Sequence, residues 1–183
     1  AQMPLTCWAF RKTAPELKRA DVQFFFSPVS VTASAWFPGI SAGAGHVVTA
    51  RNALRYPGSR GTVQLVSSDP RVAPRIVTNL LSDERDVQSL VRAVRQTREL
   101  MSTAPLSALI DREMAPSAGQ ASEEQLIALV RQNARPACHP SCTCAMGDGP
   151  DAVVDAQLRV RGIEGLRVAD ASVMPNIIGG NLN

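Results

Sequence analysis

Strand-like and helix-like segments occupy separate parts of this sequence, and that separation decides the fold class. Short β-branched or aromatic runs bounded by turn residues predict strands at 22–26, 46–51, 62–66 and 74–77. Helical periodicity follows at about 83–102 and again from Ser122 to Pro136. Because the strands precede the helices instead of alternating with them, we expect an α+β fold, an antiparallel sheet with flanking helices.

Turn and cap residues set the expected limits of these elements. The turn at 56–61, with proline and glycine at its centre, predicts an antiparallel hairpin between strands 46–51 and 62–66. His46 would then be an ordinary strand residue. Ser82 is the expected N-cap of the first helix. Ser122, followed three residues later by Gln125, predicts a capping box for the second.

Composition excludes several classes of protein. The net charge of +3 over 183 residues comes from scattered basic residues, which argues against a nucleic-acid surface. No apolar run is long enough to span a membrane, and the first residues lack the pattern of a signal peptide. We expect the four cysteines to be free thiols, which favours a cytoplasmic location. They are Cys7, Cys138, Cys142 and Cys144.

A metal site is the first alternative for the cysteine-rich stretch around His139. Structural zinc sites pair two ligands with a second pair at a distance. Here all four candidate ligands lie in one short loop, between Cys138 and Cys144. Four ligands so close together cannot easily surround a tetrahedral ion, so we expect no metal.

The densest set of chemically useful residues lies between His139 and Asn183. A single histidine is more often structural than catalytic, but His139 stands beside Pro140 and several small residues. The glycines at 179 and 180 permit close approach to a ligand, or they belong to a frayed chain end. Asp170 follows the strand-like run 166–169; it suits either a ribose or ribityl hydroxyl or a helix N-cap.

Five motifs in this stretch together resemble a known family. The first is His-Pro-Ser-Cys-Thr-Cys-Ala-Met-Gly at 139–147, and the others are Val-Val-Asp at 153–155, Leu-Arg-Val-Arg-Gly at 158–162, the run from 165 to 175, and Gly-Asn-Leu-Asn at 180–183. They resemble the C-terminal part of the glucose–methanol–choline (GMC) oxidoreductases, which are FAD-dependent alcohol oxidases and dehydrogenases. Cys142 stands where the family has glycine, and Asn176 where serine or threonine is common.

The resemblance implies a site and a cofactor, FAD. His139 would be the catalytic base, which takes the hydroxyl proton of a small alcohol, and Asn183 would bind the substrate oxygen. Four further residues would contact FAD: Asp170 and Ala171 at its ribityl–pyrophosphate region, and Asn181 and Leu182 at the flavin ring.

The resemblance also implies a division of the chain. Residues 1–137 would form part of a substrate-binding domain, and residues 138–183 an active-site loop and a segment that returns to complete an FAD-binding α/β domain. The family's Gly-rich N-terminal half has no counterpart here, so we expect an N-terminal FAD-binding chain or segment as partner. A hydroxynitrile lyase of the same fold and a non-catalytic binding chain are the alternative functions.

Overall fold

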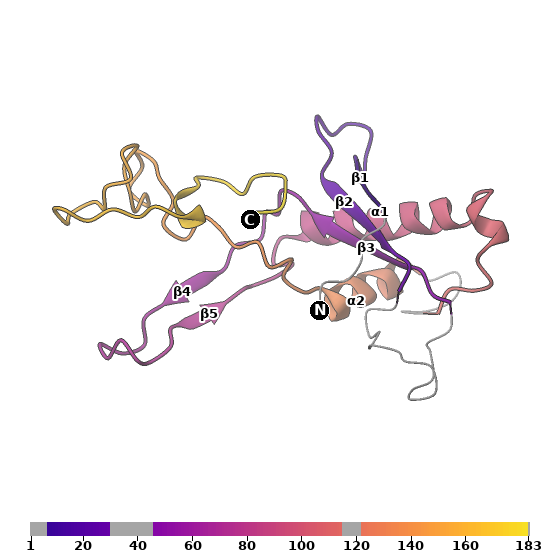
Figure 1. Ribbon diagram of the computed structural model, residues 1–183, viewed down its shortest axis with the longest axis horizontal. Helices are drawn as coiled ribbons and strands as arrows, with labels where there is room; N and C mark the ends of the chain where they lie inside the picture. Colours follow the sequence, from indigo (N-terminus) through magenta and orange to yellow (C-terminus); the bar gives the residue numbers. More distant parts are fainter. Residues whose placement is uncertain (1–6, 30–45, 115–121, 183) are drawn as a thin grey trace, which may run out of the picture. The chain divides into compact units, whose positions relative to one another are not determined.

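The computed structural model describes residues 7–29, 46–114 and 122–182 (Figure 1). The chain divides into two compact units. The first unit contains Ala1–Leu54 and Gln88–Val130, and the second contains Arg55–Val87 and Arg131–Asn183. This division groups residues by compactness alone, so the assignment of 1–137 and 138–183 to two functional domains stays a prediction.

The first unit is built on a three-stranded antiparallel sheet in the order β1–β2–β3. The strands are β1 (Cys7–Arg11), β2 (Val22–Ser27) and β3 (Thr49–Leu54). Val22 and Phe24 of the central strand are buried against Ala93 of helix α1 (Glu84–Met101). Since the helix packs on the sheet through these apolar side chains, the α+β fold is confirmed.

The helix ends confirm one predicted cap and correct the other. Ahead of α2 (Glu123–Asn133), the backbone N–H of Ser122 donates to Gln125 Oε1 at 2.8 Å, and the N–H of Gln125 donates to Ser122 Oγ at 3.3 Å. For α1 the predicted Ser82 cap is wrong. Asp83 accepts from the backbone N–H of Arg85 at 2.9 Å, and the hydrogen-bonded Arg85 side chain lowers the pKa of Asp83 to about 2.

The predicted hairpin between strands 46–51 and 62–66 is wrong. Strand β3 pairs with β2, whereas β4 (Thr62–Gln64) pairs with β5 (Arg75–Val77) in a separate antiparallel hairpin. His46 precedes β3, which begins at Thr49, so it is not a strand residue. The hairpin exposes its apolar side chains: Val63 is 51%, Leu65 85% and Ile76 64% accessible.

Isolated bridges, not strands, organise the residues after α2. Val154, fully buried, bridges to Met146 and to Val160, and Arg159 bridges to Arg167. The predicted strand at 166–169 is therefore a single bridge followed by a short 3₁₀ helix, η2 (Ala171–Val173). Among the described residues, no helix is long and apolar enough to span a membrane.

Gly61, at the start of the β4–β5 hairpin, has no room for a side chain. A Cβ there would lie 2.1 Å from the carbonyl oxygen of Val77. Since overpacking costs about 1–3 kcal/mol, we expect Gly61→Ala to lower the free energy of unfolding by that amount. The control is Gly149→Ala in the same unit, where nothing lies within 4 Å. Equal melting temperatures for the two variants would contradict this prediction.

Candidate active site

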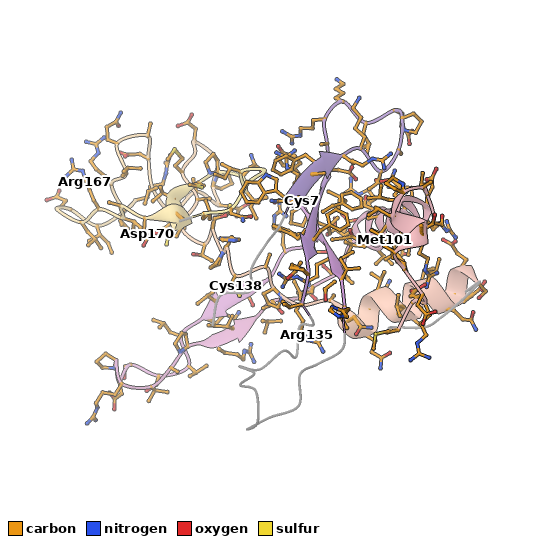
Figure 2. All side chains as sticks on the ribbon, turned by 45° about the vertical axis from the view of Figure 1, so that its right-hand side comes forward. Cys7, Met101, Arg135, Cys138, Arg167 and Asp170 are labelled. Atoms are coloured by element: carbon orange, nitrogen blue, oxygen red, sulfur yellow. The ribbon has the colours of Figure 1, made fainter. Side chains whose placement is uncertain are left out.

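The loop that carries His139 is held along η2 by backbone hydrogen bonds. Every second N–H of the loop donates to a successive carbonyl of the 3₁₀ helix: Cys142 to Ala171 (3.3 Å), Cys144 to Ser172 (2.9 Å) and Met146 to Val173 (2.9 Å). Figure 2 labels Cys138, next to the histidine, and Asp170, which precedes η2. The predicted cofactor residue Ala171 therefore has a structural contact with the histidine loop.

Asp170 has a structural role in the same arrangement. Its carboxylate accepts the backbone N–H of Ser172 at 2.8 Å and caps η2. Hydrogen bonds from the Ser172 side chain and then its backbone lower the pKa of Asp170, so the carboxylate is ionised at neutral pH. Of the two roles considered from sequence, the N-cap is confirmed, and the contact with a ribityl hydroxyl stays a prediction.

The backbone at Cys142 explains why the family has glycine at this position. Its φ is +72°, in the left-handed region that glycine adopts freely and that costs other residues about 1–2 kcal/mol. The hydrogen bond from Cys142 to Ala171 ties this residue to η2 despite that cost.

Replacing Cys142 by glycine should therefore raise the melting temperature, because it relieves the strained backbone. The expected gain is about 1 kcal/mol, reduced by the greater entropy of glycine in the unfolded chain. Cys144→Gly is the control, since Cys144 is not among the residues with positive φ, and it should lower the melting temperature. A loss of stability in both variants would contradict this explanation.

The C-terminal segment, by which we mean residues 179–182, contacts the histidine. The backbone N–H of Leu182 donates to His139 Nδ1 at 3.1 Å, and both residues are half-buried. The structure thus brings His139 together with Leu182, a predicted flavin contact. Asn181, beside it, is exposed. Asn183 lies outside the described residues, so its predicted place near His139 stays a prediction.

This contact determines which nitrogen of a neutral His139 carries the hydrogen. Nδ1 accepts a hydrogen bond, so it holds a lone pair, and the ring hydrogen is on Nε2. The Nε2–H is then the ring group that can donate to a ligand.

Two residues that the sequence did not single out hold the C-terminal segment. Arg55 Nε donates to the carbonyl oxygen of Gly179 at 2.6 Å. The ring of Tyr56 lies against the same glycine, where a Cβ would be 2.0 Å from the tyrosine oxygen. More than a hundred residues separate the partners in sequence, so no local pattern could have indicated the contact.

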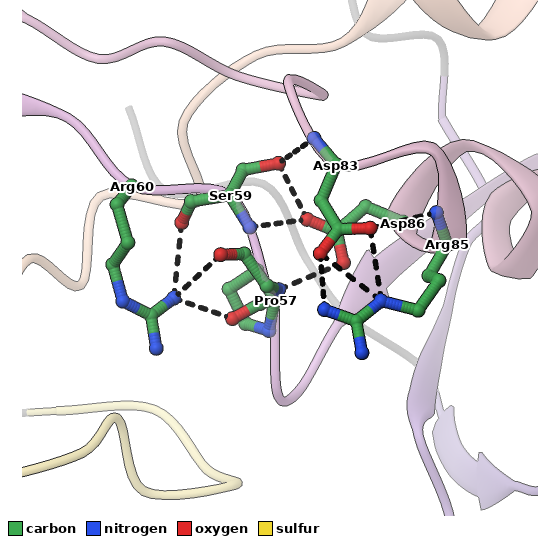
Figure 3. Close-up of polar contacts among 7 residues, drawn as sticks. Pro57, Ser59, Arg60, Asp83, Arg85 and Asp86 are labelled. Carbon is green, nitrogen blue, oxygen red and sulfur yellow. Dashed lines mark hydrogen bonds and ion pairs between the residues drawn. The ribbon is translucent and has the colours of Figure 1, made fainter.

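The turn after Tyr56 is anchored to the first turn of α1 (Figure 3). The buried carboxylate of Asp86, 6% accessible, accepts the N–H of Gly58 at 2.8 Å and both the N–H and the hydroxyl of Ser59, at 2.8 and 2.6 Å. The Arg60 guanidinium donates back to three carbonyls of the turn, those of residues 57–59. Arg55 and Tyr56 therefore lead directly into a rigid turn.

Comparison with known proteins identifies the family. The model of the family described as GMC oxidoreductase matches residues 57–183. An oxygen-dependent choline dehydrogenase of Ectopseudomonas mendocina is 44% identical over 175 residues, which cover 95% of this chain and 30% of that protein. One from Serratia proteamaculans is 43% identical, with 31% of its length covered.

Solved structures agree with the sequence relatives. A pyridoxine 4-oxidase from Mesorbium loti superposes with a TM-score of 0.80 at 25% identity, over 95% of this chain and 34% of that one. A formate oxidase of Aspergillus oryzae RIB40, studied for modification of its FAD, gives 0.77 at 28% identity, over 93% and 30%.

The family match, the sequence relatives and the solved structures together identify this chain as the C-terminal portion of a family member. The chain belongs to the GMC oxidoreductase family. FAD is accordingly its cofactor, as predicted from the resemblance. The chain spans about a third of the length of the curated relatives it matches.

Proposed function

We propose that this chain is the C-terminal part of an enzyme that oxidises a small alcohol to the aldehyde or ketone with FAD. The observation that carries the proposal is the family match, because it runs through both the His139 loop and the C-terminal segment. The contact of Leu182 with His139 supports it by joining these two parts. The choline dehydrogenase relatives make choline the first alcohol to test.

The backbone at Gly180 is open to close approach by a flat ring, because no described residue other than its chain neighbours lies within 4 Å of the position that a Cβ would take there. Asn181 and Leu182, next in the chain, would line the flavin, and Asp170 and Ala171 would lie at its ribityl–pyrophosphate region. When bound, FAD would supply the hydride acceptor for oxidation of the alcohol.

His139 is the proposed catalytic base. The hydroxyl proton of the alcohol passes to Nε2, which must hold a lone pair at that moment. The ring hydrogen then has to be on Nδ1, and the N–H of Leu182, which now donates to Nδ1, must withdraw. Proton abstraction by His139 is therefore coupled to a small movement of the C-terminal segment. Asn183 is proposed to donate to the substrate oxygen.

The proposed partner is the part of the enzyme that this sequence does not cover. The relatives are about three times longer than the matched region. That part would supply the Gly-rich dinucleotide-binding fold, which holds the ADP portion of FAD. Residues 1–137 would contribute to the substrate-binding domain, and residues 138–183 would complete the FAD-binding domain.

The test is anaerobic addition of alcohols, choline first, to the complete enzyme while its visible flavin absorbance is recorded. An alcohol oxidoreductase loses the oxidised-flavin bands as substrate is consumed. A hydroxynitrile lyase of the same fold leaves them unchanged and releases cyanide from a cyanohydrin. A purified complete protein without flavin would contradict the proposal and favour a binding role.

A further inference from the structure

We propose that Arg55 and Tyr56 are positioning residues that fix the tautomer of His139 through the backbone of residues 179–182. The inference rests on the proposed function only for its catalytic meaning, because the contacts themselves do not depend on the reaction. Neither residue belongs to the motifs that identify the family in this sequence.

The first step is the grip on Gly179. Arg55 Nε donates to its carbonyl at 2.6 Å, and the guanidinium lies 5.3 Å from the centre of the Tyr56 ring, which holds the arginine in a cation–π arrangement. A Cβ at this position would lie 2.0 Å from the tyrosine oxygen, so a larger residue fits only if the Tyr56 ring moves.

The second step is the path from Gly179 to the histidine. The N–H of Gly180 donates to the carbonyl of Ile178 at 2.8 Å, a tight turn centred on the gripped glycine. Three residues after that glycine, the N–H of Leu182 reaches His139 Nδ1. A short chain fixed at residue 179 and folded by one turn has little freedom to move its N–H at residue 182.

The third step is the attachment of Arg55 and Tyr56 themselves to helix α1. Tyr56 is followed at once by the turn that Asp86 binds through three hydrogen bonds. The first turn of α1 thereby holds Arg55 and Tyr56 in place. These two residues hold the C-terminal segment, whose Leu182 N–H donates to His139.

The consequence is chemical. The hydrogen bond at one imidazole nitrogen decides whether the other gives or takes a proton. With Leu182 in place, His139 presents Nε2–H and donates to a ligand oxygen. When Leu182 withdraws, Nε2 can hold a lone pair and act as a base. The strength of the grip at Gly179 therefore sets the balance between the two tautomers.

The test is ¹⁵N spectroscopy of the complete enzyme labelled at histidine, with the His139 signals assigned by their loss in His139→Ala. In the wild type we expect Nδ1 at the shift of an unprotonated nitrogen and Nε2 at that of a protonated one. Arg55→Gln and Gly179→Ala should move both signals toward averaged values, because the N–H of Leu182 is no longer held in place.

Three controls separate positioning from general damage. Arg55→Lys keeps a charged donor and should stay closer to the wild type than Arg55→Gln. Tyr56→Ala, which removes the ring that holds Arg55, should move the signals in the same direction as Arg55→Gln. Gly149→Ala, where nothing lies within 4 Å, should leave them unchanged.

The inference and the proposed function fail separately. Wild-type ¹⁵N signals in Arg55→Gln, in a variant that melts normally, would overturn the inference whatever the reaction is. A flavin that no alcohol reduces would overturn the function and leave the tautomer result standing.

Discussion

Replacing His139 by alanine should lower the turnover of the complete enzyme by about 100- to 10,000-fold, the usual contribution of a general base. The side chain is half-buried and accepts one hydrogen bond, from the N–H of Leu182, through a ring nitrogen. The variant should therefore fold and keep its flavin. The decisive measurement is the rate of anaerobic flavin reduction at saturating alcohol, with the flavin content of each preparation determined beside it.

The other histidine of this chain provides the matched control. His46 is exposed and precedes β3, so His46→Ala should reduce flavin at the wild-type rate. His139→Gln, which keeps a hydrogen-bonding side chain but no base, should be about as slow as His139→Ala. Full turnover in either His139 variant would refute the assigned role.

Replacing Asp86 by alanine should give a large loss of stability, about 3 kcal/mol. The carboxylate is buried and accepts three hydrogen bonds from Gly58 and Ser59, and a hydrogen bond to a charged group contributes about 1.5–3 kcal/mol. The exposed side of the turn can rehydrate, which keeps the loss below the sum of three bonds. Thermal or urea unfolding of the complete protein measures the change.

Two further variants sharpen this result. Asp86→Asn keeps one acceptor oxygen but turns an NH₂ group toward the remaining donors, so its stability should fall between wild type and Asp86→Ala. Asp151, exposed in the same unit, is the control, and Asp151→Ala should unfold like the wild type. If Asp86→Ala and Asp151→Ala have the same unfolding midpoint, Asp86 does not anchor the turn.

Local signals in the sequence predicted the elements that local physics controls. The capping box at Ser122 and Gln125 uses residues three positions apart, and both of its hydrogen bonds form. Strand β2 is rich in β-branched and aromatic residues and lies in the core. The prediction of strand pairing failed because pairing depends on partners that are distant in the sequence. The turn expected to join β3 and β4 is bound instead by Asp86, a residue of α1.

The candidate site shows the same limit. The family motifs identified His139 and the C-terminal segment, and the structure joins them through Leu182. Arg55 and Tyr56 escaped notice because an arginine and a tyrosine before a turn have no distinctive pattern, and their partner is Gly179. Positive φ at Cys142 was equally invisible, although the family's preference for glycine there had marked the position as unusual.

The exposed apolar side chains of the β4–β5 hairpin bear on how this protein is handled in the laboratory. A two-stranded ribbon has a free hydrogen-bonding edge on each side, and Leu65 and Ile76 are largely accessible. Free edges of this kind recruit strands from neighbouring molecules and lead to aggregation. The 183-residue chain produced alone should therefore precipitate. Co-expression with the remainder of the enzyme is the better route to material for crystallisation.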